Sequence, residues 1–546
     1  MTRESGRIVR SGSGLGSRVS RRDVLRTGAL GGMALAAPWV LQACGSSPSS
    51  AAQGNAKTPK RGGSLIWAMD EDPVNLVPLG MTNTSNYWVT SLIYESLTMF
   101  DRTLAIKPGL AESWETPDDL TYIFKLRKNV RFHSGKAFGS DDVLYSLKQQ
   151  KNPPPPGSVT AYYPKIASVE AMDQYTVKIS LSQPDTTVLG YFAWNEYSHI
   201  IPNGLYERID PRTQSDGTGP FKLVEYVPND HVTLARNTGY WNSSLPYLDN
   251  LTMKVLPDEQ TRLAALQSGA VDGSNDITAD SARTVSGYNS LQVLKGLTAA
   301  FCEMELTIHG DGKPWDQLKV RQAINKAIDR QEIIDKVFGG DAVYTSKIPA
   351  GYGEWAISPT ALKSSWQKYD LAGAKKLMAE AGMSSGFSVQ LQSISQPASY
   401  TENAQVIKAQ LQKININVNV QPLEIATFGI NNANGSFQWQ STGRGMRGDP
   451  SEFFTDFDPA GSIYQAWFKG GYDSSAITAS VKQAMTTVDA AKRKQVYDQM
   501  QQTVLTDLPT IPLVNPMQYH IVRSRVHGMY VDYGGLLRGL TVTWVD

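Results

Sequence analysis

Segments with helical periodicity and segments with strand periodicity follow one another along the chain, and this alternation limits the fold more than any other feature. Residues 402–425, ENAQVIKAQLQKININVNVQPLEI, contain both patterns in direct succession. Their first half places apolar side chains at helical spacing, and their second half alternates apolar and polar side chains as a half-buried strand does. A helix that leads directly into a strand is the unit of an α/β layer. We therefore predict an α/β fold.

Strand patterns are also present in the first half of the chain. We expect strands over residues 62–70, 120–132 and 175–181, and a hairpin over residues 219–237 with its turn at residues 228–230. The run NPPPPGS that begins at Asn152 is typical of an extended polyproline-like loop.

Helical patterns are clearer in the second half. The spacing of apolar residues predicts a helical stretch over residues 320–338 that ends at Gly339 and Gly340, since glycine commonly follows the last helical turn. A second helix is expected from Asp370, a suitable N-terminal cap, to Gly382.

Composition and charge limit the class of protein. A chain of 546 residues with 41% hydrophobic and 19% charged residues is a folded globular protein with more than one domain. The formal net charge is +1, but residues 1–26 hold seven arginines and only two acidic residues. The remainder is therefore mildly acidic, and a protein that binds nucleic acid needs a basic surface instead.

The N-terminus has the pattern of an export signal. The sequence Ser-Arg-Arg-x-x-Leu-Arg around Arg21 and Arg22 resembles the twin-arginine signal, although Val24 stands where that signal usually has Phe. Residues 27–43 form an uncharged and mostly apolar run, which is shorter than the roughly 20 residues that a membrane-spanning helix needs. We therefore predict that residues 1–43 are a signal peptide.

The signal ends in a sequence that suggests a lipid anchor. LQAC resembles a bacterial lipobox in which Cys44 is the lipid-bearing residue, although Gln42 is unusual at its position. Ordinary cleavage without a lipid is the alternative. Residues 44–60 are rich in Ser, Ala, Gly and Pro and are expected to form a flexible tether. If Cys44 is lipidated, Cys302 has no partner for a disulfide.

The sequence contains no motif typical of a hydrolase or of a metal site. None of its six histidines belongs to an H-E-x-x-H motif or a close ligand pair, and the G-x-S-x-G motif is absent. We expect no catalytic residue, no metal and no cofactor. A secreted hydrolase that uses paired carboxylates remains a distant alternative, and a membrane-tethered chaperone or sensor is another.

Residues 443–448, GRGMRG, match the dinucleotide-binding pattern G-x-G-x-x-G. That pattern requires a βαβ unit and an acidic residue about 20 positions later, at the end of a second strand. The residues after Pro450, SEFFTDFDPAGSIYQAWF, show no such strand. Asp449 and Pro450 suit the cap and first position of a short helix instead. The sequence therefore favours a different role for these glycines.

A series of motifs occurs in a fixed order between residue 61 and the C-terminus. Residues 107–147 contain Leu-Ala-Glu-Ser-Trp, Tyr-x-Phe-x-Leu-Arg, Phe-His-x-Gly and an acidic pair at Asp141 and Asp142, and GTGPFKLVEY, RNTGYW, LAALQSGAVD, VRQAINKAIDR and DLAGAKKLMAEAG follow. In this order the motifs resemble the family 5 extracellular solute-binding proteins of bacterial ABC importers. These are the dipeptide-, oligopeptide- and nickel-binding type.

The resemblance implies a fold and a function. The fold is two-lobed and periplasmic-binding-protein-like, of type II, in the large variant with an extra subdomain, a hinge and a central ligand cleft. The expected parts are lobe I over residues 61–87, 200–297 and 515–546, the extra subdomain over residues 88–199, and lobe II over residues 298–514. Such a protein is an exported monomer that closes around a small solute, peptide or peptide-like, and delivers it to a membrane permease. An opine, an oligosaccharide or a metal chelate is the alternative solute.

The resemblance also implies candidate ligand-binding residues. By family position these are Asn83, Ser85, Phe301, Cys302 and Trp439, with packing in the core as the alternative for Trp439. Asp449 is also expected among the ligand-binding residues. The glycines before Asp449 are expected to line the cleft and to let the backbone approach the solute.

One position departs from the family pattern. Peptide-binding relatives commonly carry an Asp three residues before the position of Asp449, and this Asp pairs with the amino terminus of the peptide. Met446 stands at that position, and Arg444 and Arg447 are close to it in sequence. Because an arginine can hold a carboxylate or phosphate with two hydrogen bonds, we infer a pocket that prefers an anionic or neutral solute. The alternatives are that another acid binds an amine or that the arginines face solvent.

Overall fold

The computed structural model describes residues 58–79, 83–152, 165–194 and 198–546. Arg21, Arg22 and Cys44 lie outside the described residues, as does the predicted polyproline-like loop after Asn152. Within the described ranges, no helix combines the length and the apolar character that crossing a membrane requires.

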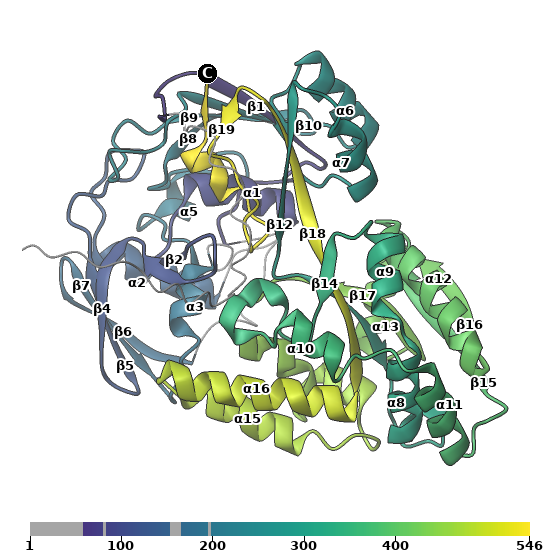
Figure 1. The fold of residues 1–546 in the computed structure, drawn as a ribbon. Helices are drawn as coiled ribbons and strands as arrows, with labels where there is room; N and C mark the ends of the chain where they lie inside the picture. Colours follow the sequence, from purple (N-terminus) through teal and green to yellow (C-terminus); the bar gives the residue numbers. More distant parts are fainter. Residues whose placement is uncertain (1–57, 80–82, 153–164, 195–197) are drawn as a thin grey trace, which may run out of the picture. The chain divides into compact units, whose positions relative to one another are not determined.

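A mixed sheet of twelve strands organises the α/β structure (Figure 1). Its strand order is β16-β15-β17-β13-β18-β11-β1-β10-β9-β8, and β12 and β14 pair with β18 beside this path. The strands before residue 298 are β1 (Ser64–Met69), β8 (Phe221–Val227), β9 (His231–Arg236), β10 (Asn250–Val255), β11 (Gly273–Ser274) and β12 (Leu291–Leu297). Those after residue 298 are β13 (Phe301–Leu306), β14 (Ala342–Tyr344), β15 (Phe387–Ile394), β16 (Ile416–Leu423), β17 (Trp439–Arg444) and β18 (Thr510–Arg523).

The long strand β18 connects two groups of elements that we call the first and second lobes (Figure 1). Its beginning pairs with β13 and β14 of the second lobe, and its end pairs with β11 and β12 of the first lobe. The chain crosses between the lobes twice, at residues 298–300 and at residues 514–517. The buried Asn515 joins the two crossings, because its amide donates to the backbone oxygens of Thr298 and Ala300 at 3.1 and 2.5 Å. The lobe boundaries at 297/298 and 514/515 stay a prediction.

A separate antiparallel sheet belongs to the first half of the chain. Its order is β4-β5-β7-β6, and buried aromatic and aliphatic side chains form its own core, which includes Phe124, Val177 and Phe192. The sheet lies within the segment predicted as the extra subdomain. Its elements and their neighbours are α1 (Thr84–Ile93), β2 (Thr98–Phe100), β3 (Ile106–Pro108), β4 (Ala111–Asp118), β5 (Thr121–Leu126), α2 (Ser140–Lys151), β6 (Ile166–Asp173), β7 (Thr176–Leu181), α3 (Val188–Ala193) and α5 (Leu205–Arg208).

Helices cover the large sheet in both lobes. In the first lobe α6 (Glu259–Ser268) and α7 (Ala279–Val285) pack on β11, β12 and β18. The second lobe contains α8 (Leu318–Ala327), α9 (Arg330–Val337), α10 (Pro359–Ser364), α11 (Leu371–Glu380), α12 (Ser399–Leu411), α13 (Ile425–Asn434), α14 (Ser462–Trp467), α15 (Ser475–Thr486) and α16 (Ala490–Asp507), with short 3-10 turns η2 (Pro314–Asp316), η3 (Ala350–Trp355), η4 (Gln412–Ile414) and η5 (Pro450–Phe457).

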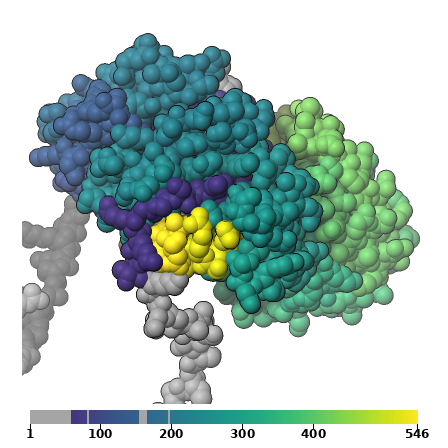
Figure 2. Space-filling model, turned by 90° about the horizontal axis from the view of Figure 1, so that it is seen from above, coloured from purple at the N-terminus to yellow at the C-terminus, as the bar shows by residue number. Residues whose placement is uncertain are grey.

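The C-terminal segment returns to the first lobe and lies beside the start of the described chain. It contains β19 (Val526–His527), η6 (Arg538–Val542) and β20 (Trp544–Val545). Figure 2 shows this segment next to the N-terminal strand, and an ion pair between Lys60 and Asp546 at 3.3 Å joins the two.

Most of the predicted elements are confirmed. The segment over residues 402–425 forms α12, the turn η4 and β16, and residues 219–237 form the hairpin of β8 and β9. Asp370 caps α11 by accepting a hydrogen bond from the backbone N–H of Gly373. The helical stretch over residues 320–338 is two helices rather than one. The first helix ends at Ala327, and Asp329 caps the second, because its carboxylate accepts from the backbone N–H groups of residues 331 and 332.

Candidate ligand cavity

A cavity of about 1070 Å³ is lined by residues of both lobes. The first lobe contributes residues that follow β1 and β11, residues of α1, and residues of β18 and the segment after it. The second lobe contributes the end of α9, the start of α12 and the loop after β17. A volume of this size fits a small molecule or a short peptide, since ligand pockets commonly enclose about 300–1,000 Å³.

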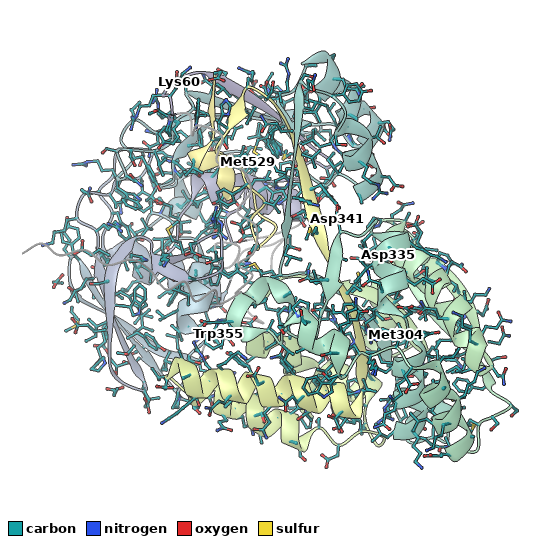
Figure 3. All side chains as sticks on the ribbon, viewed as in Figure 1. Lys60, Met304, Asp335, Asp341, Trp355 and Met529 are labelled. Carbon is teal, nitrogen blue, oxygen red and sulfur yellow. The ribbon has the colours of Figure 1, made fainter. Side chains whose placement is uncertain are left out.

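The cavity wall is rich in acidic side chains. Of the described residues that line it, Arg447 carries a positive charge and six carry carboxyl groups: Asp70, Glu71, Asp276, Asp280, Asp341 and Glu402. Asp341 lies at the start of β14, near the strands that connect the lobes (Figure 3). It accepts hydrogen bonds from Lys295 at 2.8 Å and from the hydroxyl of Tyr519 at 2.6 Å. Asp341 is therefore already engaged with the first lobe.

Three of the acids lie at the carboxyl ends of two parallel strands. β1 pairs with β11 in a register that places Ala68 opposite Ser274. Asp70 and Asp276 each follow two residues later, and Glu71 comes next. Burial raises the pKa of all three carboxyl groups, and the charge of a neighbouring acid adds to the increase for Asp70 and Glu71. Their charged forms are therefore disfavoured without a positively charged partner.

Aromatic side chains form another part of the wall. Tyr87, Trp88 and Trp194 line the cavity together with Tyr400 and Phe338. The indole N–H of Trp88 donates to the backbone oxygen of Gly535 at 3.1 Å, which fixes the plane of the ring. Rigid aromatic walls with a few oriented polar groups are typical of ligand pockets.

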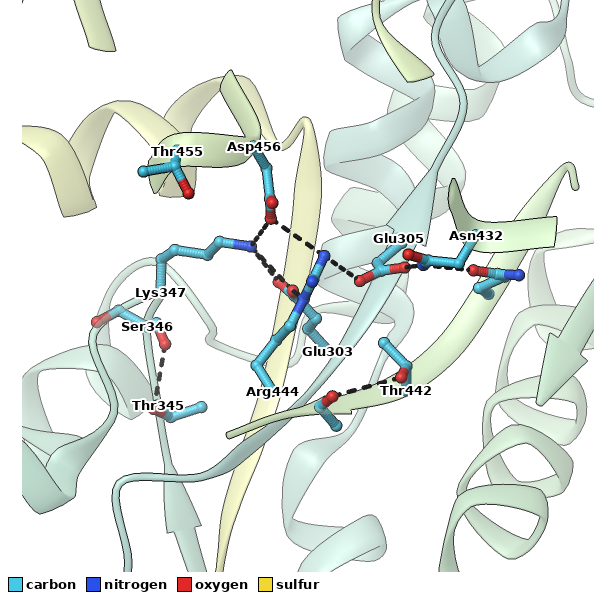
Figure 4. A network of polar contacts seen from close by, with 12 residues as sticks. Glu303, Glu305, Thr345, Ser346, Lys347, Asn432, Thr442, Arg444, Thr455 and Asp456 are labelled. Carbon is cyan, nitrogen blue, oxygen red and sulfur yellow. Dashed lines mark hydrogen bonds and ion pairs between the residues drawn. The ribbon is translucent and has the colours of Figure 1, made fainter. Parts of the chain in front are cut away.

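The predicted ligand residue Arg444 does not line the cavity. It belongs to a buried ion-pair network with Glu303, Glu305, Lys347 and Asp456 (Figure 4). The guanidinium of Arg444 lies 2.9 Å from Glu303, 2.5 Å from Glu305 and 3.0 Å from Asp456. Although burial disfavours its charge, these three carboxylates raise the pKa of Arg444. The placement differs from the prediction because two of the acids, Glu303 and Glu305, lie on the neighbouring strand β13, and the third, Asp456, lies in η5.

Two other residues of the same segment do line the cavity. Met446 is almost fully buried, and its sulfur lies next to Gly534, where an added Cβ would be only 2.7 Å away. The backbone N–H of Arg447 donates to the hydroxyl of Tyr352 at 2.8 Å. The thioether of Met446 carries no charge that could pair with an amine. The cavity wall therefore has a neutral side chain where peptide-binding relatives commonly have an Asp.

Three candidate residues lie in the core instead of the cavity wall. Phe301 and Trp439 are fully buried, and their rings make edge-to-face contacts with Phe453 and Trp315 at centroid distances of 5.7 and 5.4 Å. Cys302 is a free, buried thiol, and burial raises its pKa to about 12. β13 and β17 are central strands, so side chains on both of their faces are covered.

Asn83, Ser85 and Asp449 are not part of the cavity wall, and two of them cap helical segments. Asn83 caps α1 by accepting from the backbone N–H of Asn86 at 2.9 Å, and Ser85 is fully buried. The backbone N–H of Ser85 and the side chain of Asn83 also bind the carboxylate of Glu71, which partly offsets the increase in its pKa. Asp449 caps η5 as predicted and accepts from Ser451 and from the hydroxyl of Tyr497.

The glycines of residues 443–448 have separate roles. Gly443 belongs to β17, and an added Cβ would lie 2.2 Å from the hydroxyl of Tyr400, so this glycine makes room for a protein side chain and not for a pyrophosphate. Gly445 lines the cavity, with open space where its Cβ would be. The segment leads into the 3-10 turn η5 and not into an α-helix, which excludes the dinucleotide arrangement there.

The sequence predictions missed Asp70, Glu71, Asp276 and Gln518. A usable signal was present, because Asp70 and Glu71 follow the predicted strand over residues 62–70, and ligands of open α/β sheets bind near the carboxyl ends of the strands. Among the described residues, no group of three or more His, Cys, Asp and Glu side chains is arranged to hold a metal ion.

Comparison with known proteins gives consistent matches over most of the chain. The family described as "Bacterial extracellular solute-binding proteins, family 5 Middle" matches residues 105–465. Heme-binding protein A of Haemophilus influenzae is 29% identical, over 90% of this chain and 95% of its own length. The dipeptide-binding protein of Escherichia coli is also 29% identical, over 86% of this chain and 92% of its own.

A solved structure agrees with the sequence comparison. The binding protein AgaA from A. tumefacien R10, in complex with agropinic acid, superimposes with a TM-score of 0.72 at 26% identity. The superposition covers 89% of this chain and 99% of that chain.

Proposed function

Because this chain belongs to the family 5 bacterial extracellular solute-binding proteins, we propose that its cavity captures one peptide or peptide-like solute for an ABC permease. The protein is a substrate-binding component of an importer and not an enzyme. The family is exported, so capture takes place outside the cytoplasm.

The observation that carries the proposal is the composition of the cavity wall. Residues after β1 and β11 lie on one side of the strand crossings, and residues of α12 and the β17 loop lie on the other. A solute between them contacts both lobes at once. Contacts made to both lobes stabilise a closed arrangement relative to an open one, and the permease then recognises that arrangement.

The test is uptake by cells that lack the gene. Deletion is expected to abolish accumulation of the solute that co-purifies with the protein, and expression of the full chain restores it. Uptake that is unchanged in the deletion strain, with normal growth of the complemented strain, refutes a transport role and favours a chaperone or sensor.

A second candidate solute is an anionic opine or a sugar-like compound. It is favoured by Arg447 in the cavity wall and by similarity to a binding protein solved with agropinic acid. Competition between a labelled peptide and such an acid, measured on the same protein, separates the two candidates.

We also propose that the chain is exported by a twin-arginine signal and anchored through Cys44. Replacing both Arg21 and Arg22 by Lys is expected to retain the precursor in the cytoplasm, since the signal depends on the arginine pair. Cys44→Ala is expected to abolish incorporation of a labelled fatty acid and to release the protein from membranes. Fatty-acid labelling that persists in Cys44→Ala contradicts the lipid assignment.

A further inference from the structure

The carboxyl ends of β1 and β11 form a distinct part of the cavity wall. The paired register of the two strands ends at Ala68 and Ser274, and Asp70 and Asp276 each follow two residues beyond it. The two acids are close enough for the charge of Asp276 to raise the pKa of Asp70. Both side chains and that of Glu71 line the cavity.

Hydrogen bonds hold the carboxylate of Asp276 in a fixed orientation. One oxygen accepts from the amide nitrogen of Gln518 at 2.9 Å, and the other accepts from Asn275 at 2.6 Å. Asn275 is itself held by the indole N–H of Trp67 at 2.8 Å. Burial raises the pKa of Asp70 and of Asp276, and the charge of Arg262 lowers it in part. The terminal nitrogens of Arg262 donate to backbone oxygens of residues 256, 257 and 276. Arg262 is therefore engaged mainly with the backbone.

Among the residues that the structure describes, none donates a hydrogen bond to two of the acceptor atoms in this wall. Oδ1 of Asp70 and Oε1 of Gln518 are both buried and both without a partner. The amide of Gln518 cannot turn to donate there without losing its bond to Asp276. A buried acceptor without a donor costs about 1–3 kcal/mol, and this cost is removed when a ligand supplies the donor. An ammonium group offers three donors and a guanidinium offers five.

Aromatic side chains of the same cavity suit a positive charge as well. Tyr87, Trp88 and Trp194 are part of its wall, and the face of an aromatic ring attracts a cation. Unpaired acceptors, a surplus of carboxylates and aromatic faces all favour the same chemistry.

We propose that the wall formed by Asp70, Glu71, Asp276 and Gln518 binds a positively charged nitrogen group of the solute, either a primary ammonium or a guanidinium. This inference rests on the proposed function, because it names the class of solute for the same cavity. It reverses the preference for an anionic or neutral solute that the sequence suggested from Arg444 and Arg447. It also supplies an acidic partner for an amine in a protein that has Met446 where peptide-binding relatives commonly have the amine-binding Asp.

The first test compares three peptides on the full chain, purified in mild detergent, by isothermal titration calorimetry. The probes are Ala-Leu-Ala, its N-acetyl derivative, and N-acetyl-Ala-Lys-Ala. The first and third carry one cationic nitrogen each and the second carries none. We expect the two cationic peptides to bind at least about tenfold more tightly, because a hydrogen bond to a charged group contributes about 1.5–3 kcal/mol.

The second test changes the wall. Asp70→Asn and Asp276→Asn are expected to weaken binding of N-acetyl-Ala-Lys-Ala by about tenfold or more and to leave N-acetyl-Ala-Leu-Ala unchanged. The matched control is Asp210→Asn, which removes an exposed carboxylate that pairs with Arg212 outside the cavity wall. Removing one of two neighbouring like charges does not destabilise the ligand-free protein, so Asp70→Asn is expected to unfold at the wild-type temperature or above. A lower unfolding temperature, with unchanged affinity for the lysine peptide, shows a structural role and overturns the proposal.

The outcomes also separate this inference from the proposed function. If all three peptides bind within about twofold of one another, the protein is a peptide-binding protein but the cationic subsite is refuted. If none of them binds, the inference fails for amines carried by peptides, and the uptake experiment still decides the proposed function.

Discussion

Replacing Arg444 by Met tests whether this residue supports the fold or the ligand. The guanidinium contacts three buried carboxylates, those of Glu303, Glu305 and Asp456, and Lys347 is the second cation of the network. At an effective dielectric constant of about 20, two unit charges roughly 3 Å apart attract each other by about 5 kcal/mol. Most of this attraction offsets the cost of removing the charges from water, so the pairwise values do not add up to a stability.

The net loss follows from the charges that remain. Burial raises the pKa of Glu305 to about 7, so this residue can take up a proton when Arg444 is absent. Lys347 then compensates one of the two remaining carboxylates, Glu303 or Asp456, and one buried charge is left unpaired. An unpaired buried charge costs about 3–5 kcal/mol. We expect Arg444→Met to lower the apparent free energy of unfolding by this amount.

The assay is urea denaturation followed by tryptophan fluorescence, combined with calorimetric titration of a bound peptide. Arg447→Met is the matched variant, because Arg447 lines the cavity. It is expected to change affinity more than stability, with a loss of about 1 kcal/mol or less in unfolding free energy. The reasoning is refuted if Arg444→Met unfolds like the wild type but no longer binds peptide.

Three further predictions concern single side chains. The pKa of Glu305 is higher in the folded protein than its ordinary value, so the free energy of unfolding of the wild type falls as pH rises from about 4.5 through 7. Glu305→Gln should remove this fall, which amounts to at most about 1.4 kcal/mol per pH unit. Urea denaturation between pH 5 and 8 measures it. Asp449→Ala should destabilise by about 1–3 kcal/mol, because the cap of η5 and the partner of Tyr497 are lost, and unchanged denaturation would contradict this. Gly443→Ala should weaken peptide binding by displacing the hydroxyl of Tyr400, and adding Tyr400→Phe should restore it; failure of this rescue would exclude that contact as the cause.

The parts of the fold that could be predicted are those with local signals. The helix and strand over residues 402–425, the hairpin over residues 219–237 and the cap at Asp370 each depend on residues that are neighbours in sequence. The break at Asp329 was also encoded locally, as an acidic residue before a new helical turn, but the continuous apolar spacing concealed it.

The parts that could not be predicted depend on contacts between distant segments. β18 pairs with strands that precede it by about 200 residues, and no local pattern fixes such a register. Arg444 illustrates the consequence for the site. Its sequence neighbours suggested a cleft residue, but the adjacent strand β13 presents Glu303 and Glu305 to it, and these acids engage it fully.

The acidic wall was missed for the same reason. Asp70 and Asp276 are separated by about 200 residues, and they come together because β1 and β11 pair in parallel and each chain continues past its strand toward the cavity. Residue types near a strand end could have pointed to Asp70 and Glu71. The orphan acceptors on Asp70 and Gln518, which give the wall its chemical preference, are visible only in three dimensions.

The most direct test of the account is native mass spectrometry of the full chain purified from its own host, recorded before and after denaturation. The account predicts one released compound per chain, with a mass and fragmentation that show a peptide or peptide-like molecule bearing an ammonium or guanidinium group. A released compound that is acidic or sugar-like, with no cationic nitrogen, would contradict it and return Arg447 to the centre of recognition.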